Sequence, residues 1–189
     1  AQSQYATFFD EVVALTPGDP RLELCLQCGT CGGSCPSAAD MEHTPRALFG
    51  MIAAGMREPV LRSNTPWYCV SCYSCTTRCP QDIPITDLMY TLKRMAINEG
   101  YFQESRAADA PEFSETFIEF VENYGRSFEL GLATRYHLRH HPLNAMKMAT
   151  GLGLDMFRKG RMALIPKRIK QIKQLQAILD KAKALSVSA

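Results

Sequence analysis

Two runs of cysteines with the same internal spacing constrain this sequence more than any other feature. Each run reads C-x-x-C-x-x-C-x-x-x-C-P. The first run contains Cys25, Cys28, Cys31 and Cys35, followed by Pro36. The second run contains Cys69, Cys72, Cys75 and Cys79, followed by Pro80. The second run repeats the first at an offset of 44 residues, and the two runs use all eight cysteines of the chain.

This spacing is typical of a site for cubane iron–sulfur clusters. A cubane has four iron corners, and each corner needs one thiolate. Three cysteines separated by two residues lie on one tight loop and can reach three corners of the same cubane. The fourth cysteine precedes a proline, which biases it toward an extended conformation that points away from the loop. In the bacterial two-cluster ferredoxins whose spacing these runs match, the fourth cysteine binds the other cluster.

We therefore expect two [4Fe-4S] clusters with exchanged fourth ligands. The first cluster is expected to bind Cys25, Cys28, Cys31 and Cys79. The second cluster is expected to bind Cys69, Cys72, Cys75 and Cys35. Disulfide bonds are disfavoured, because a disulfide framework spreads its cysteines to join distant segments. A zinc site is the other alternative, but zinc usually takes two separated C-x-x-C pairs rather than one uninterrupted run.

The residues between the cysteines differ between the two runs. The first run has small residues, which let the backbone approach an inorganic core: Gly29, Gly32, Gly33 and Ser34. The second run has bulkier ones: Val70, Tyr73, Ser74, Thr76, Thr77 and Arg78. Hydrogen bonds to sulfur are one determinant of cluster potential. The sequence therefore predicts two clusters that differ in reduction potential.

Helical patterns flank both cysteine runs, so the sequence predicts a mainly α protein. We expect an N-terminal helical arm over residues 1–20, a helical di-[4Fe-4S] ferredoxin-like domain over 21–105 and a helical C-terminal extension for subunit docking over 106–189. In the arm, Ser3 is the expected cap and Thr16-Pro17-Gly18 the expected stop.

The flanks of the cluster domain carry helix-start signals. Thr44 followed by Pro45 predicts one helix, with Leu48 and Ile52 on its apolar face. Thr86 followed by Asp87 predicts a second helix that ends near Gly100. Small clostridial-type ferredoxins have β-hairpins at these places, so this domain is expected to be of a helical type.

The C-terminal extension also has helical patterns. Apolar residues of one stripe are ended by Gly125: Phe113, Phe117, Phe120, Val121 and Tyr124. His137 and His141 are four residues apart, a spacing that can bind a metal, but a solvated or interface segment is the favoured interpretation because no third ligand is evident. A basic amphipathic helix is expected from Pro166 to Ala189. It suits an acidic partner or a membrane surface, and a solvated helix face is the alternative.

Composition narrows the function further. The 189 residues carry a formal net charge of +2, which does not point to a nucleic acid. Two oxidised cubanes with four thiolates each would change this charge to about −2. No basic and apolar secretory leader is visible at residues 1–10, and the stretch from 148 to 165 is too charged to span a membrane. A cytoplasmic protein is expected. No dinucleotide fingerprint, phosphate-binding loop or catalytic triad stands out, so we expect no catalytic residue.

The residues around the cysteines resemble the C subunit of heterodisulfide reductase. The similarity includes Leu24 to Pro36, Thr44-Pro45-Arg46, Trp67-Tyr68-Cys69, Gly151 to Lys159 and the basic helix from Pro166. The resemblance implies an electron relay between a flavin-containing A subunit and a B subunit whose clusters are held on motifs with adjacent Cys-Cys pairs. This chain has no such pair, so the resemblance implies a non-catalytic subunit of an oxidoreductase complex.

Two other functions fit the cysteine runs. Similar cysteine loops occur in succinate dehydrogenase, fumarate reductase and glycolate oxidase iron–sulfur subunits. The basic C-terminal segment therefore also suits the iron–sulfur subunit of a membrane-associated, quinone-linked dehydrogenase. A ferredoxin-like shuttle is the third possibility, although its function needs little beyond the clusters and this chain has long helical flanks.

Overall fold

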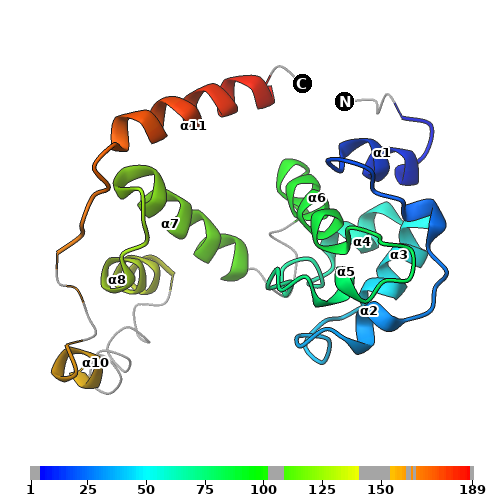
Figure 1. Ribbon diagram of the computed structural model, residues 1–189, viewed down its shortest axis with the longest axis horizontal. Coiled ribbons are helices and arrows are strands. Elements are labelled where there is room, and N and C mark those ends of the chain that lie inside the picture. Colours follow the sequence, from blue (N-terminus) through cyan, green and yellow to red (C-terminus); the bar gives the residue numbers. More distant parts are fainter. Residues whose placement is uncertain (1–4, 102–108, 141–153, 161–162, 164, 188–189) are drawn as a thin grey trace. The chain divides into compact units, whose positions relative to one another are not determined.

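The computed structural model describes residues 5–101, 109–140, 154–160, 163 and 165–187, and within these ranges it contains helices and no strand (Figure 1). The mainly α class predicted from the sequence is confirmed. The chain divides into two compact units, Ala1–Pro111 and Glu112–Ala189. The predicted boundary between residues 105 and 106 lies outside the described residues.

The helices of the first unit are α1 Phe8–Leu15, η1 Leu22–Leu24 (a 3-10 helix), α2 Thr30–Gly33, α3 Pro45–Ala53, α4 Arg57–Arg62, α5 Ser74–Thr77 and α6 Ile85–Asn98.

A reciprocal capping box sets the start of α1. The Oγ1 atom of Thr7 accepts a hydrogen bond from the Asp10 N–H at 3.1 Å, and the Asp10 carboxylate accepts one from the Thr7 N–H at 3.1 Å. The cap is therefore Thr7, whereas the predicted cap, Ser3, lies outside the described residues. The predicted stop is confirmed, since Thr16 is the C-cap and its hydroxyl donates to the Val12 carbonyl oxygen at 2.7 Å.

The core of the first unit is built largely from α3 and α6. The predicted start of α3 is confirmed, with Thr44 as N-cap and Pro45 as the first helical residue. Leu48 and Ile52 of α3 are fully buried, as are Leu88 and Leu92 of α6. Each such side chain contributes about 2 kcal/mol when it leaves water. This packing fixes the helices that follow the two cysteine runs.

The start of α6 differs from the sequence-based prediction. Pro84 is the N-cap, and Thr86 lies inside the first turn. The side chain of Thr86 is buried, with a relative exposure of 1%. Threonine and aspartate often cap helices because their side chains accept hydrogen bonds from first-turn N–H groups. Here the threonine is directed into the protein interior instead.

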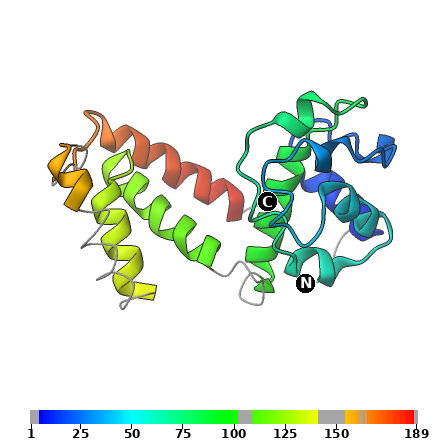
Figure 2. The ribbon, with the colours of Figure 1, turned by 90° about the horizontal axis from the view of Figure 1, so that it is seen from below.

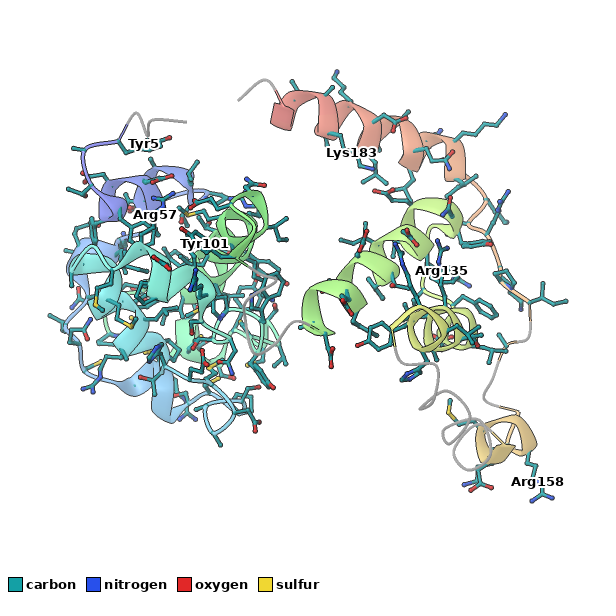
Figure 3. All side chains as sticks on the ribbon, turned by 180° about the vertical axis from the view of Figure 1, so that it is seen from behind. Tyr5, Arg57, Tyr101, Arg135, Arg158 and Lys183 are labelled. Carbon is teal, nitrogen blue, oxygen red and sulfur yellow. The ribbon has the colours of Figure 1, made fainter. Side chains whose placement is uncertain are left out.

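A shared arginine joins α1, α4 and α6. Arg57 of α4 donates to Glu11 of α1 from Nη2 at 3.1 Å and to Glu99, just after α6, from Nε at 3.1 Å. Figure 3 shows Arg57 in the first unit, next to the α1 helix. The hydrogen bonds to Glu11 and Glu99 raise the pKa of Arg57. Since the arginine side chain is only 32% exposed, these bonds are less weakened by water than those of an open surface pair.

Each cysteine run folds into a loop followed by a very short helix. α2 follows the first loop and α5 follows the second, and the two short helices contact each other. α2 also contacts α3, and α5 contacts α6. In Figure 1 the pair α2 and α5 lies side by side at one end of the first unit. The two cysteine loops are thus brought together at one place by the α3 and α6 core.

The second unit is helical as well. Its helices are α7 Asp109–Tyr124, α8 Glu129–His140, α10 Leu154–Arg158 and α11 Ile172–Val187. The rings of Phe113 on α7 and Tyr136 on α8 meet edge to face, with centroids 5.7 Å apart. Arg135 of α8 (labelled in Figure 3) binds Glu119 of α7 at 2.7 Å. These contacts hold α7 and α8 against each other.

The last helix begins later than predicted and lies along α7 (Figure 2). The sequence predicts a helix from Pro166, but α11 begins at Ile172. The reason is tertiary, because the Ile169 N–H donates to the Tyr124 carbonyl oxygen at 3.0 Å instead of to a helical acceptor. Further along, Lys183 binds the Glu122 carboxylate of α7 at 2.6 Å.

Two further predictions concern the second unit. The aromatic stripe of α7 is only partly buried, since Phe120 is 8% exposed whereas Phe113 and Phe117 are 46% and 39% exposed. His137 lies on α8, but His141 is outside the described residues, so the proposed histidine pair stays untested. In the described part of the chain, no helix is long and apolar enough to cross a membrane.

Candidate cluster-binding site

The first candidate site is a cavity lined by four cysteines from both runs. Three of them, Cys25, Cys28 and Cys31, come from the first loop, and the fourth, Cys79, comes from the end of the second run. The space within this cavity, part of it open to solvent, is about 350 Å³. Four cysteines from two loops line this one space, and their sulfurs are the soft donors that iron–sulfur clusters require. The residues present therefore fit one cubane.

The rest of this cavity combines an apolar wall with two polar side chains. Phe49, Ile83 and Ile85 are buried side chains that line it. The Nε2 atom of Gln27 donates to the Sγ of Cys25 at 3.5 Å. Arg46 also lines the cavity. The pKa of the Cys28 thiol is lowered mainly by its hydrogen bond with Thr30 and, to a smaller extent, by the positive charge of Arg46. The site thus offers shielding from water together with donors and positive charge for thiolates.

The second loop repeats this arrangement with different neighbours. The hydroxyl of Ser74 lies 3.5 Å from the Cys72 Sγ and lowers the pKa of that thiol. In the first loop, the Thr30 hydroxyl does the same for Cys28 at 3.4 Å. A lowered pKa favours the thiolate form that binds iron. In both loops, therefore, a neighbouring hydroxyl favours the thiolate form of the second cysteine.

Lys93 of α6 is the positively charged neighbour of the second loop. Its Nζ donates to the carbonyl oxygen of Cys69 at 3.4 Å. The ammonium also lies over the rings of Tyr90, at 5.0 Å, and Trp67, at 5.9 Å. Burial lowers the pKa of Lys93, while the thiolate of Cys69 acts in the opposite direction. A partly buried cation beside a cysteine loop suits a group that carries net negative charge.

The backbone shows the same duplication as the sequence. Gln27 and Ser71, which stand 44 residues apart, both have a φ of 55°. Gly29 and Tyr73, again 44 residues apart, have φ values of 81° and 60°. These left-handed residues curl each loop so that its cysteines face one side. The similarity of the two halves is thus one of three-dimensional structure as well as spacing.

The cysteines of each loop differ in exposure. Cys28 and Cys72 are exposed, whereas Cys31 of α2 and Cys75 of α5 are half-buried. Burial raises the pKa of the Cys31 thiol most, and the negative charges of Cys25 and Cys75 raise it further. Cys31 and Cys75 are therefore close enough to interact electrostatically. Each loop has an outer cysteine at the surface and an inner cysteine that faces the other half.

The remaining predicted ligands are consistent with the exchange but do not test it. Cys35 is half-buried and follows Ser34, the C-cap of α2. Since α2 contacts α5, Cys35 lies on the half of the domain that adjoins the second loop. In the described part of the chain, no three Cys, His, Asp or Glu side chains converge on a site for a single ion. A cubane does not require such convergence, because each thiolate binds a different iron.

Three buried polar groups near the second loop were not identified from the sequence. Among the described residues, no hydrogen-bond partner satisfies Thr76 Oγ1, Thr86 Oγ1 or Trp67 Nε1. Buried polar groups are normally paired. Thr76 and Thr86 lie beside Cys75, where their hydroxyls lower the pKa of a thiol that burial raises. Unpaired donors next to a cysteine are expected where a sulfur-rich group binds.

Comparisons with known proteins agree with this site. Residues 21–83 match the family model of the 4Fe-4S dicluster domain. Over 79 residues the chain is 40% identical to an iron-sulfur C subunit of the CoB–CoM heterodisulfide reductase of Methanocaldococcus jannaschii, covering 42% of each chain. Over 100 residues it is 34% identical to the C subunit of the H(2):CoB-CoM heterodisulfide,ferredoxin reductase of Methanothermobacter marburgensis, covering 53% of this chain and 54% of that one.

The alignment with a third relative covers more of this chain. Over 112 residues the chain is 36% identical to the C subunit of the ferredoxin:CoB-CoM heterodisulfide reductase of Methanosarcina acetivorans, covering 59% of this chain and 42% of that one. The alignments span about half the length of these curated relatives. The resemblance to the C subunit of heterodisulfide reductase is confirmed. The dicluster domain gives the chain two [4Fe-4S] clusters.

Proposed function

We propose that this chain is the electron-transfer subunit of a cytoplasmic heterodisulfide reductase-like complex. It relays electrons between a flavin-containing subunit and a catalytic subunit that carries adjacent Cys-Cys pairs. The three relatives described above are each named as a C subunit of a heterodisulfide reductase, which supports this assignment. We also propose the exchanged ligand sets, with Cys79 completing the first cluster and Cys35 completing the second.

The arrangement of outer and inner cysteines carries the proposal. Cys28 and Cys72 are exposed, while Cys31 and Cys75 are half-buried and near each other. Each cluster, when bound, accepts and releases one electron at a time. The inner cysteines bring the two sites together, and the outer cysteines bring each site to the surface. Each cluster site therefore reaches the surface at one place, which we call its port: the loop around Cys28 for the first cluster and the loop around Cys72 for the second. A relay between two partners requires one port for each cluster.

Exposed apolar residues at both ports support docking. Leu26 of the first loop is 64% exposed, and Val70, at the matching position of the second loop, is 65% exposed. Leu24 and Tyr68, also 44 residues apart, are 45% and 38% exposed. Exposed apolar side chains that surround a functional group favour burial against a partner. The duplication thus places a similar apolar rim on each port.

The experiment measures electron exchange at each port separately. The holo-chain is purified without oxygen and mixed rapidly with the purified flavin subunit or the purified Cys-Cys-rich subunit, while the visible absorbance reports cluster oxidation state. Leu26→Asn and Val70→Asn remove one apolar anchor each without adding charge. Loss of a well-packed anchor costs roughly 1–2 kcal/mol, or about tenfold in rate at limiting concentration. We expect each variant to slow exchange with one partner only.

The matched control is Ile97→Asn, because Ile97 is 50% exposed on α6 and lies outside both loops. Iron content and visible spectra should stay unchanged in all three variants. The relay proposal is wrong if both loop variants slow electron exchange with the same partner subunit and neither variant slows exchange with the second partner subunit. Purification of the chain with a multi-span membrane subunit instead would favour the quinone-linked dehydrogenase.

A further inference from the structure

Thr86 is a buried hydroxyl that the described part of the protein leaves without a hydrogen-bond partner. Its side chain is 1% exposed, so water does not satisfy it. It lies in the first turn of α6 but does not cap that helix, because Pro84 is the N-cap. A buried hydroxyl is energetically costly unless a neighbouring atom accepts a hydrogen bond from it. The structure therefore calls for an acceptor close to this hydroxyl, beyond the hydrogen bonds that the described residues form.

A candidate acceptor is the sulfur of Cys75, because Cys75 lies on α5, which contacts the α6 helix that carries Thr86. Burial raises the pKa of the Cys75 thiol, and the Thr86 hydroxyl is the largest influence that opposes this effect. Cys75 is also half-buried and packs against the apolar core. In such surroundings a hydrogen bond to sulfur acts more strongly than it would in water. Thr86 also lies at the positive end of the α6 dipole, which favours negative charge at the same place.

The first half of the domain has no equivalent hydroxyl. Thr86 is the second residue of α6, and the second residue of α3, the helix that follows the first run, is Arg46, which has no hydroxyl. The residue 44 positions before Thr76, the other unpaired hydroxyl at Cys75, is Gly32. The first loop has instead the exposed Gln27, which donates to Cys25. The donors to sulfur are therefore distributed unequally between two otherwise duplicated sites.

We infer that the Thr86 hydroxyl donates to the Cys75 sulfur of the second cluster and raises the reduction potential of that cluster. The physical reason is that a donor at sulfur stabilises the more negative, reduced state in preference to the oxidised state. Thr86 acts through Cys75 and is therefore a tuning residue. The inference depends on Cys75 being a cluster ligand, and it does not depend on which complex contains the chain.

The test is a redox titration of the anaerobically purified holo-chain, followed by electron paramagnetic resonance. Thr86→Val replaces the hydroxyl by a methyl group of nearly the same size, and Thr86→Ser retains the hydroxyl. Cys72→Ser identifies the signal of the second cluster, because Cys72 belongs to that loop. We expect Thr86→Val to lower the midpoint potential of the second cluster and to leave that of the first unchanged. Thr86→Ser should stay close to the wild-type value.

Thr91→Val is the matched control. Thr91 is also 1% exposed on α6, but its hydroxyl is paired with that of Thr16 at 3.1 Å, so its removal should change neither potential. Gln27→Leu should lower the midpoint potential of the first cluster by less than Thr86→Val lowers that of the second, because Gln27 is exposed.

The inference is overturned if Thr86→Val moves neither potential, moves both equally, or moves only the first. If Thr86→Val fails to retain its clusters, Thr86→Ser decides. A large fall in potential in Thr86→Ser, despite its hydroxyl, would show that the threonine acts through packing.

Discussion

Gly29 and Tyr73 occupy the same position in the two cysteine loops, and both have a left-handed backbone, with φ values of 81° and 60°. Glycine adopts this conformation without strain, whereas a residue with a Cβ atom does not. A Cβ on Gly29 would lie 3.6 Å from the Arg46 side chain, which is an ordinary contact. Both loops therefore need a left-handed backbone at this position. The first loop has a glycine there, which adopts it without strain, whereas the second loop has a tyrosine.

This relationship predicts opposite effects on kinetic stability. Gly29→Ala should destabilise the holo-protein by about 1–2 kcal/mol through backbone strain alone. Tyr73→Gly should stabilise the second loop by a smaller amount, roughly 0.5–1 kcal/mol, because relief of strain is partly offset by added chain entropy. The rate of cluster bleaching in guanidinium chloride measures both. Gly33→Ala is the control, since Gly33 has no positive φ and an added Cβ meets no atom within 4 Å. Equal rates for Gly29→Ala and Gly33→Ala would contradict the argument.

The exchanged ligand sets predict which cluster each fourth cysteine supports. Cys79→Ser should damage the cluster held by Cys25, Cys28 and Cys31, because Cys79 lines the cavity that those residues form. Cys35→Ser should damage the other cluster. Paramagnetic resonance of the two reduced variants separates the signals. A Cys79→Ser protein in which only the second cluster is perturbed would show that each run binds its own cluster.

Metal analysis checks the dicluster assignment directly. The anaerobically purified chain should contain about eight irons, and its visible absorption should bleach on reduction. The isolated chain should exchange electrons with artificial dyes but turn over no physiological substrate. Stoichiometric zinc without a chromophore would be incompatible with the assignment.

The shared arginine predicts a loss of stability without a change in redox properties. Arg57→Met removes the hydrogen bonds to Glu11 and Glu99 and leaves two carboxylates close together. We expect the first unit to lose about 2–3 kcal/mol, since hydrogen bonds to charged groups are among the stronger ones. Arg62→Met is the comparison, because the Arg62 and Glu58 side chains form a more exposed pair whose loss typically costs under about 1 kcal/mol. Similar unfolding midpoints for the two variants would argue against this prediction.

The last helix predicts a separation between cluster binding and docking. Deleting Pro166–Ala189 removes contacts with Glu122 and Tyr124 of the second unit, so both clusters should stay spectroscopically intact. Capture of the flavin or Cys-Cys-rich subunit should weaken, because the deletion removes the surface proposed for docking. Lys183→Met, which breaks the ion pair with Glu122 and leaves the rest of the segment in place, should have a smaller effect. Loss of the clusters would make this segment part of their fold, and unchanged capture would make it a solvated face. Membrane pelleting that the deletion abolishes would favour the quinone-linked alternative.

The sequence was most informative where structure is determined by neighbours in the chain. Cubane ligands lie three residues apart on one loop, so their spacing predicts the dicluster domain. The start of α3 depends on Thr44 and Pro45 alone and is also predicted. Gly125 ends α7 as expected, because it adopts a φ of 74°.

Features that depend on distant partners escaped prediction. Thr86 reads as a helix cap by local rules, but the packing of α6 buries its hydroxyl beside Cys75. The segment after Pro166 reads as helix, but Ile169 bonds to Tyr124 instead. The bridge from Arg57 to Glu11 and Glu99 joins residues more than 40 positions apart. No pattern in the sequence marks such long-range pairs.

The exposure of Cys28 and Cys72 also determines how this protein is damaged. Thiolates that are both accessible and low in pKa react first with oxidants, and the Thr30 and Ser74 hydroxyls lower the pKa of these two thiols. Peroxide or oxygen should therefore attack each cluster at its outer corner. A chain that has not assembled would lose its iron sooner than one whose two ports are covered. Assembly with partners would thus act as protection against oxidation as well as a route for electrons.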